Sequence, residues 1–192
     1  GGRDAEAAQS FEEALRIKGD FGLARYQLGR TYAQQGRLAE AERELAAATE
    51  AAPNLPDAHY GYATLVLRRD PASADALAHL RRAVALAPGA AQPTNDLGFT
   101  LATNPDPALR DGAAAVALLE PLAAAPGGAA PAVLDALAAA YAEVGRFDEA
   151  VALAARAAAG ARAAGQDAIA RAIEERRALY AAGRPFRPAV PP

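Results

Sequence analysis

Several residue types are absent or nearly absent, and each absence excludes a kind of chemistry. The 192-residue sequence has no cysteine, no methionine and no tryptophan, and Lys18 is its single lysine. Without cysteine there are no disulfides, thiol nucleophiles or thiolate-bound metals. The two histidines lack metal-ligand spacing, and Ser10 and Ser73 lie outside any nucleophile elbow. The sequence therefore predicts a protein that is not an enzyme and that holds no metal and no cofactor.

Charge and hydrophobicity exclude two further kinds of partner. The 20 basic and 23 acidic residues give a net charge of −3, and no basic stripe is present to neutralise phosphates. No apolar run approaches the roughly 20 residues that span a bilayer. We therefore expect neither nucleic-acid binding nor direct membrane insertion. Because the first residue is Gly1 and not methionine, we expect a processed chain or a piece of a longer one.

Alanine dominates what is present. Hydrophobic residues make up 52% of the sequence but aromatic residues only 6%, so the apolar content is mostly alanine, leucine and valine. Alanine has the highest helix propensity, and its small side chain lets helices approach closely. The composition predicts thin layers of packed helices, and it is typical of a GC-rich, bacterial genome.

A pattern of two helices joined at a glycine recurs along the chain. In residues 134–151, Leu134, Leu137 and Tyr141 occupy one helical face, Gly145 ends that helix, and a second helix follows. Equivalent positions recur upstream, and Pro53 and Pro88 close two units 88 − 53 = 35 positions apart. The best example contains Leu28, Gly29, Tyr32, Gly36, Leu38, Ala41, Leu45, Ala48 and Pro53.

These spacings resemble the tetratricopeptide repeat, which has the pattern L-G-x2-Y, A-x3-F and P over about 34 residues. The resemblance implies an all-α, right-handed superhelical solenoid of antiparallel helix hairpins. Residues 101–188 also resemble the C-terminal end of large bacterial tetratricopeptide proteins, where such an array is commonly a tail on a longer chain. We expect the second helix of a truncated repeat at 1–19, repeats at 20–54, 55–89, 90–130 (long and irregular) and 131–164, a capping helix at 165–183 and a Pro-rich tail at 184–192.

In that family the first helices of the hairpins line a concave groove that receives a partner peptide. Carried over position by position, the groove candidates are Tyr26, Arg30, Tyr60, Thr64, Asn95, Phe99 and Asp135. Aromatic and arginine side chains are enriched in binding surfaces. The resemblance thus implies a scaffold for a protein or peptide partner. Alternatively, these residues pack between repeats, and the array is a structural spacer that positions an attached enzymatic or membrane module.

Two related binding modes, the recognition of a terminal carboxylate and the recognition of RNA, fit this sequence less well. The family's clamp for a terminal carboxylate uses Lys and Asn where this sequence has Tyr26 and Arg30, so that mode of binding is not expected. The 35-residue spacing is also similar to the RNA-binding pentatricopeptide family, which the net negative charge disfavours.

The ends and irregular positions give further expectations. A truncated first repeat should leave Ala7, Phe11 and Ala14 partly uncovered and favour self-association at that edge. In the closing helix, one stripe should be formed by Ile169, Ile173, Arg176 or Arg177, and Tyr180. Pro121 should kink its helix or end it early, and His59 should be a packing residue.

Overall fold

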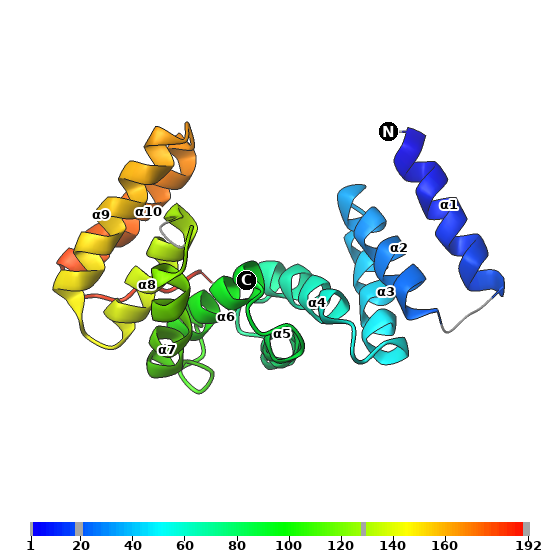
Figure 1. Cartoon of the computed structure of the whole chain (residues 1–192), viewed down its shortest axis with the longest axis horizontal. Coiled ribbons are helices and arrows are strands. Elements are labelled where there is room, and N and C mark those ends of the chain that lie inside the picture. Colours follow the sequence, from blue (N-terminus) through cyan, green and yellow to red (C-terminus); the bar gives the residue numbers. More distant parts are fainter. Residues whose placement is uncertain (1, 18–20, 128–129, 190–192) are drawn as a thin grey trace. The chain divides into compact units, whose positions relative to one another are not determined.

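The computed structural model describes residues 2–17, 21–127 and 130–189. In these residues every regular element is an α-helix. The chain divides into two compact units, unit 1 (Gly1–Pro88) and unit 2 (Gly89–Pro192). Figure 1 labels the helices of both.

Unit 1 consists of one helix followed by two helix hairpins. Its helices are α1 (Gly2–Ile17), α2 (Gly22–Gln34), α3 (Leu38–Ala51), α4 (Pro56–Arg69) and α5 (Ala74–Leu86). α2 pairs with α3 and α4 pairs with α5, while α1 packs on α2 and α4 contacts both α2 and α3 (Figure 1). Each helix thus packs on its neighbours in the chain, as in a stack of repeats.

Unit 2 has two hairpins and a closing helix. Its helices are α6 (Ala91–Thr103), α7 (Gly112–Ala124), α8 (Pro131–Glu143), α9 (Phe147–Ala163) and α10 (Asp167–Ala181). α6 pairs with α7, α8 packs on both of them and on α9, and α10 covers α9 (Figure 1). The closing helix buries the apolar face that the last hairpin would otherwise expose.

Alanine marks the places where helices cross. One alanine in the first turn of each second helix, at equivalent points of four hairpins, is completely inaccessible to solvent. These residues are Ala41, Ala76, Ala115 and Ala150. A larger side chain would hold the paired helices apart, so the alanine-rich composition follows from the close packing.

Glycine allows a still closer approach in both units. A Cβ atom at Gly29 of α2 would lie 2.8 Å from Cγ of Leu45, and one at Gly98 of α6 would lie 2.5 Å from Cγ of Leu119. Both distances are below normal van der Waals contact. Leu45 and Leu119 therefore fill the space that the missing side chains leave.

Each unit contains a network of one tyrosine, one arginine and two glutamates, which we call a lock. The hydroxyl of Tyr32 donates to Oε1 of Glu12 in α1 at 2.7 Å, and the Arg37 guanidinium lies 4.0 Å from the centroid of the tyrosine ring. Gly36 adopts a φ of 76° in the turn just before this arginine, a conformation that favours glycine. Arg37 also pairs with Glu40 in the following helix. The lock therefore joins three successive helices.

The second lock has the same parts. The Tyr141 hydroxyl donates to Oε1 of Glu120 in α7 at 2.9 Å. Arg146 lies 3.7 Å from that ring centroid and donates from Nε to Oε2 of Glu149 at 2.7 Å. Its Nη1 also reaches Oε1 of Glu120 at 3.2 Å. The same contacts therefore join α7, α8 and α9.

The structure bears on two expectations, one for the first helix and one for Pro121. Phe11 is half-buried against the cluster around Leu28, while the side chains of Ala7 and Ala14 lie outside the described residues. α7 continues through Pro121 and ends soon after it, at Ala124.

The expected stripe of the closing helix was partly wrong. Ile173 and Tyr180 are fully buried, but Ile169 is 49% exposed. Ala170, which is 1% exposed, takes the inward position in its place. Because α10 packs closely on α9, the smaller side chain of Ala170 occupies the buried position.

Candidate peptide-binding site

One pocket of unit 1 lies between the first helices of its two hairpins. Tyr26 and Arg30 of α2 and Tyr60 and Thr64 of α4 all line it, and its volume is about 290 Å³. The other lining residues are Ala33, Gln34, Leu45, Gly61, Leu65 and Arg68. Four of the seven residues singled out in the sequence therefore lie together around one cavity.

The pocket is positively charged. Arg30 and Arg68 are both exposed at its edge, and none of the described residues that line it is acidic. Arg30 donates from Nη1 to Oε1 of Gln27 at 3.2 Å, and its guanidinium lies 5.5 Å from the centroid of the Tyr26 ring. A guanidinium binds a carboxylate through two parallel hydrogen bonds. This chemistry favours an acidic ligand group.

Tyr26 forms the floor of this pocket. It is only 9% exposed, and burial raises the pKa of its hydroxyl, while the charge of Arg30 has the opposite effect. A Cβ atom at Gly61 would lie 3.2 Å from Cδ2 of Leu45 and at an ordinary contact distance, 3.5 Å, from the Tyr26 ring, so Gly61 lies close to both side chains. Tyr60 and Thr64 are half-buried, and the Thr64 hydroxyl donates to the backbone oxygen of Tyr60 at 3.0 Å. Tyr26 thus also packs between α2 and α4.

The three remaining candidates lie in unit 2 and are engaged by their own chain. On α6, Asn95 donates from Nδ2 to Oδ1 of Asp96 at 3.3 Å. Its own Oδ1 is buried and accepts no hydrogen bond from a described residue. One turn later, the Phe99 ring is half-buried, with its centroid 6.4 Å from that of Phe186, a residue that follows α10.

Asp135 of α8 is paired with the closing helix. It is 8% exposed and accepts two hydrogen bonds from Arg176 of α10, from Nε to Oδ1 at 3.0 Å and from Nη2 to Oδ2 at 2.6 Å. Burial raises the pKa of Asp135, although the neighbouring guanidinium has the opposite effect. Asp135 is therefore held by α10 in this structure, and its role toward a partner stays a prediction.

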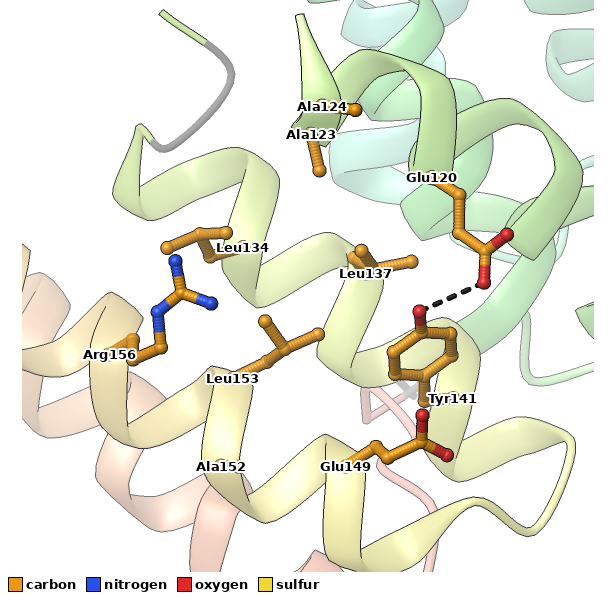
Figure 2. A pocket seen from close by; sticks show the side chains of 10 residues that line it. All are labelled: Glu120, Ala123, Ala124, Leu134, Leu137, Tyr141, Glu149, Ala152, Leu153 and Arg156. Carbon is orange, nitrogen blue, oxygen red and sulfur yellow. Dashed lines mark hydrogen bonds between the residues drawn. The ribbon is translucent and has the colours of Figure 1, made fainter.

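A second pocket, which the sequence analysis missed, lies over α8 between α7 and α9. Its volume is about 410 Å³, and Leu134, Leu137 and Leu153 form an apolar base (Figure 2). Glu120 is fixed at the edge by the Tyr141 hydroxyl, as the dashed line in Figure 2 shows. The edge also contains Glu149 and Arg156, so charges of both signs surround the apolar base.

The two histidines form a pair inside unit 1. His59 is buried, with Nε2 3.0 Å from the backbone oxygen of Pro53 and Nδ1 2.8 Å from Nδ1 of His79. Because a carbonyl only accepts, the hydrogen bonds assign the proton of His59 to Nε2, and His79 donates to its Nδ1. Burial lowers the pKa of His79. His59 thus has packing and hydrogen-bonding contacts, as expected.

The described residues contain neither a cluster of metal ligands nor a membrane-spanning helix. No group of three or more histidine, aspartate or glutamate side chains is placed to hold a metal ion within the part of the chain described. None of the helices in residues 2–17, 21–127 and 130–189 is both long and apolar enough to cross a membrane.

Helix hairpins that stack through alanine and glycine contacts define a helical repeat protein. Residues 2–65 match the family model of the tetratricopeptide repeat. This match and the repeated hairpins support a tetratricopeptide repeat fold for the chain. No curated protein is similar enough to the sequence to match.

Solved structures of the same class are similar over most of the chain. A crystal structure of MamA is 19% identical over 86% of this chain and 92% of its own, with a TM-score of 0.67. TTC0263, a thermophilic protein of this class from Thermus thermophilus, is 23% identical over 95% and 91%, with a TM-score of 0.57. YrrB, described as having an unusual peptide-binding site, is 16% identical over 92% and 89%, with a TM-score of 0.64. At these identities the similarity establishes the fold.

Proposed function

We propose that this protein is a non-catalytic scaffold for protein–protein interaction that receives a partner peptide between the first helices of its hairpins. The fold supports the general role, since related structures include one described as having a peptide-binding site. The observation that carries the specific proposal is the pocket of unit 1, where Tyr26, Arg30, Tyr60 and Thr64 meet. Rigid walls of this kind lower the cost of ordering a bound segment.

The chemistry of the pocket selects its ligand. Arg30 and Arg68 supply positive charge at the edge, Tyr60 supplies a half-buried aromatic surface, and the lining described contains no carboxylate to compete. An extended segment with an aspartate or glutamate beside an apolar residue would satisfy both features. Arginine and tyrosine often carry a large share of interface energy, about 2 kcal/mol or more at a central position.

Peptide selection on the intact chain tests this proposal. A random peptide library displayed on phage is enriched on the wild-type protein, and calorimetry measures the affinity of each selected peptide. We expect acidic residues in the selected peptides, and we expect Arg30→Glu or Tyr60→Ala to weaken binding about thirtyfold, equivalent to about 2 kcal/mol. Arg81→Glu, the same charge change at an exposed residue of α5, is the matched control and should leave binding unchanged.

Other outcomes would favour other functions. If no peptide is enriched, or if Arg30→Glu and Arg81→Glu behave alike, the spacer hypothesis is the better one. Nucleic acid that co-purifies and is released by salt would contradict both hypotheses. Self-association through the edge near Phe11 also stays a prediction. Sedimentation at increasing protein concentration would test it.

A further inference from the structure

The segment that follows the closing helix runs back over the first helices of unit 2. We call residues 184–189 the tail segment; it is not helical, and it passes α8 toward α6 (Figure 1). Arg187 donates from Nη1 to the backbone oxygen of Ala102 in α6 at 3.3 Å, and it forms an ion pair with Glu143 of α8. These contacts join positions 85 and 44 residues apart in the sequence.

An aromatic contact accompanies this ion pair. The Phe186 ring lies near Phe99, and the guanidinium of Arg176 lies 5.5 Å from the first ring centroid and 6.0 Å from the second. A guanidinium near aromatic rings is attracted by their π electrons. The tail segment is therefore recognised through one aromatic side chain and the arginine that follows it.

The two charged residues under the tail segment, Glu143 and Arg176, have other charge partners besides the tail. Glu143 also accepts a hydrogen bond from Nε of Arg110 at 3.1 Å, and Arg176 keeps both of its bonds to Asp135. Release of the tail would consequently leave neither Glu143 nor Arg176 as an unpaired charge. Since uncompensated charge is the largest cost of breaking such contacts, the tail segment can be exchanged at low cost.

Two prolines restrict the backbone of the tail segment before it binds. Pro185 and Pro188 flank the two contact residues, and both are half-buried. Proline fixes φ near −65° and has no backbone N–H group to satisfy. A segment of this kind loses little conformational freedom when it binds, which is typical of proline-flanked ligands.

We propose that the tail segment is an internal ligand of unit 2. It covers Phe99 and Ala102 of α6, Glu143 of α8 and Arg176 of α10, and it competes there with an extended segment of a partner protein that presents an aromatic residue followed directly by arginine. The chemistry of this partner follows from the tail segment itself, because Phe99, Arg176, Glu143 and the Ala102 carbonyl recognise those two side chains. This inference goes beyond the proposed function, which concerns the pocket of unit 1.

A binding competition on the full chain tests the proposal. The probe is a fluorescent peptide with the sequence of the tail segment, RPFRPA, and its binding is measured by fluorescence anisotropy. In the variant Phe186→Ala/Arg187→Ala the contact residues of α6, α8 and α10 should be uncovered, and the peptide should bind at least about tenfold more tightly than to the wild type, in which the tail covers them. Arg184→Ala, at an exposed residue of the same segment, is the control and should behave as the wild type.

Three results would overturn the proposal. The first is equal peptide affinity for the wild type and the double variant, and the second is no binding to either. The third is binding that survives replacement of the phenylalanine in the peptide by alanine. Each of these leaves the test of the unit 1 pocket unaffected, because that test uses acidic peptides and different residues.

A second measurement avoids changing the contact residues. Since the chain has no cysteine, Ala189→Cys provides a single site for a nitroxide label. The label should broaden NMR signals of α6 and α8, and excess unlabelled peptide should restore them. Absence of broadening, or broadening that excess peptide leaves intact, would contradict a displaceable tail. Broadening transferred from a labelled chain to an unlabelled one would show that the tail binds a second copy.

Discussion

Replacing both members of the Asp135–Arg176 ion pair should cost far less stability than replacing one. The two side chains are only 11% and 15% exposed, and two hydrogen bonds join them. Removal of one partner leaves the other charge away from water and unpaired, which typically costs about 3–5 kcal/mol. Replacement of both by apolar residues is often neutral or stabilising, because neither charge then has to be desolvated.

The expected values separate these two cases clearly. Asp135→Leu and Arg176→Met should each lower the free energy of unfolding by about 3 kcal/mol, so independent effects would sum to about 6 kcal/mol. We expect the double variant within about 1 kcal/mol of the wild type. The raised pKa of Asp135 supports this, since burial disfavours the ionised carboxylate even beside Arg176. Urea unfolding followed by circular dichroism measures all three variants.

An exposed pair in unit 1 is the matched control. Arg69 forms two hydrogen bonds to Glu42, at 2.7 and 3.2 Å, but the arginine side chain is 67% exposed. Because water solvates these charges, Glu42→Leu or Arg69→Met should cost about 1 kcal/mol or less. If the double variant of the buried pair loses the sum of its single variants, the argument from desolvation is refuted.

Three further predictions concern packing, pH and a buried hydroxyl. Gly98→Ala should destabilise the fold by about 1–3 kcal/mol in urea unfolding, because the new Cβ meets Leu119. Adding Leu119→Ala should cost less in that background than in the wild type; equal costs would contradict the clash. Burial lowers the pKa of His79 below 6.5, so its contribution to stability should be complete above pH 6.5 and be lost as the pH falls through the lowered value. Urea midpoints between pH 5 and 7.5 should show this loss and His79→Asn should reduce it, whereas greater stability at the acidic end would give the wrong sign. Tyr180→Phe should leave stability unchanged or raise it by up to about 1 kcal/mol, since the buried hydroxyl has no hydrogen-bond partner among the described residues. A thermal melt that shows a clear loss would reveal a missing partner.

The sequence predicts the hairpins because their signals are local. The spacing of Leu28, Gly29 and Tyr32 within one helix, and of Ala41 and Leu45 in the next, reflects contacts made inside one hairpin. The locks also leave a local signal, which only the structure explains. The strings YAQQGRLAE and YAEVGRFDE share the pattern Y-A-x2-G-R-x2-E, and in both the tyrosine, arginine and glutamate belong to one network.

Features that depend on distant segments could not be predicted. Arg176 and Asp135 are 41 residues apart, and Arg187 and Ala102 are 85 apart. The sequence pattern placed Asp135 on a first helix and Arg176 or Arg177 on the stripe of the closing helix, but it had no means of showing that the two side chains would pair. The prediction for Ile169 was wrong for a different reason. Hydrophobic periodicity favours the larger residue, whereas a close helix crossing accommodates Ala170.

Charge explains why the tail segment contacts unit 2 and not the pocket of unit 1. In unit 1 the pocket presents Arg30 and Arg68, so a segment that carries Arg187 would meet like charge there. In unit 2, Glu143 binds two arginines at once, because each of its carboxylate oxygens accepts from a different guanidinium. The basic tail segment therefore matches the charge of Glu143 in unit 2 and not that of the pocket of unit 1. A segment recognised by one unit should, on the same electrostatic grounds, be rejected by the other, since like-charge contacts in an interface oppose binding.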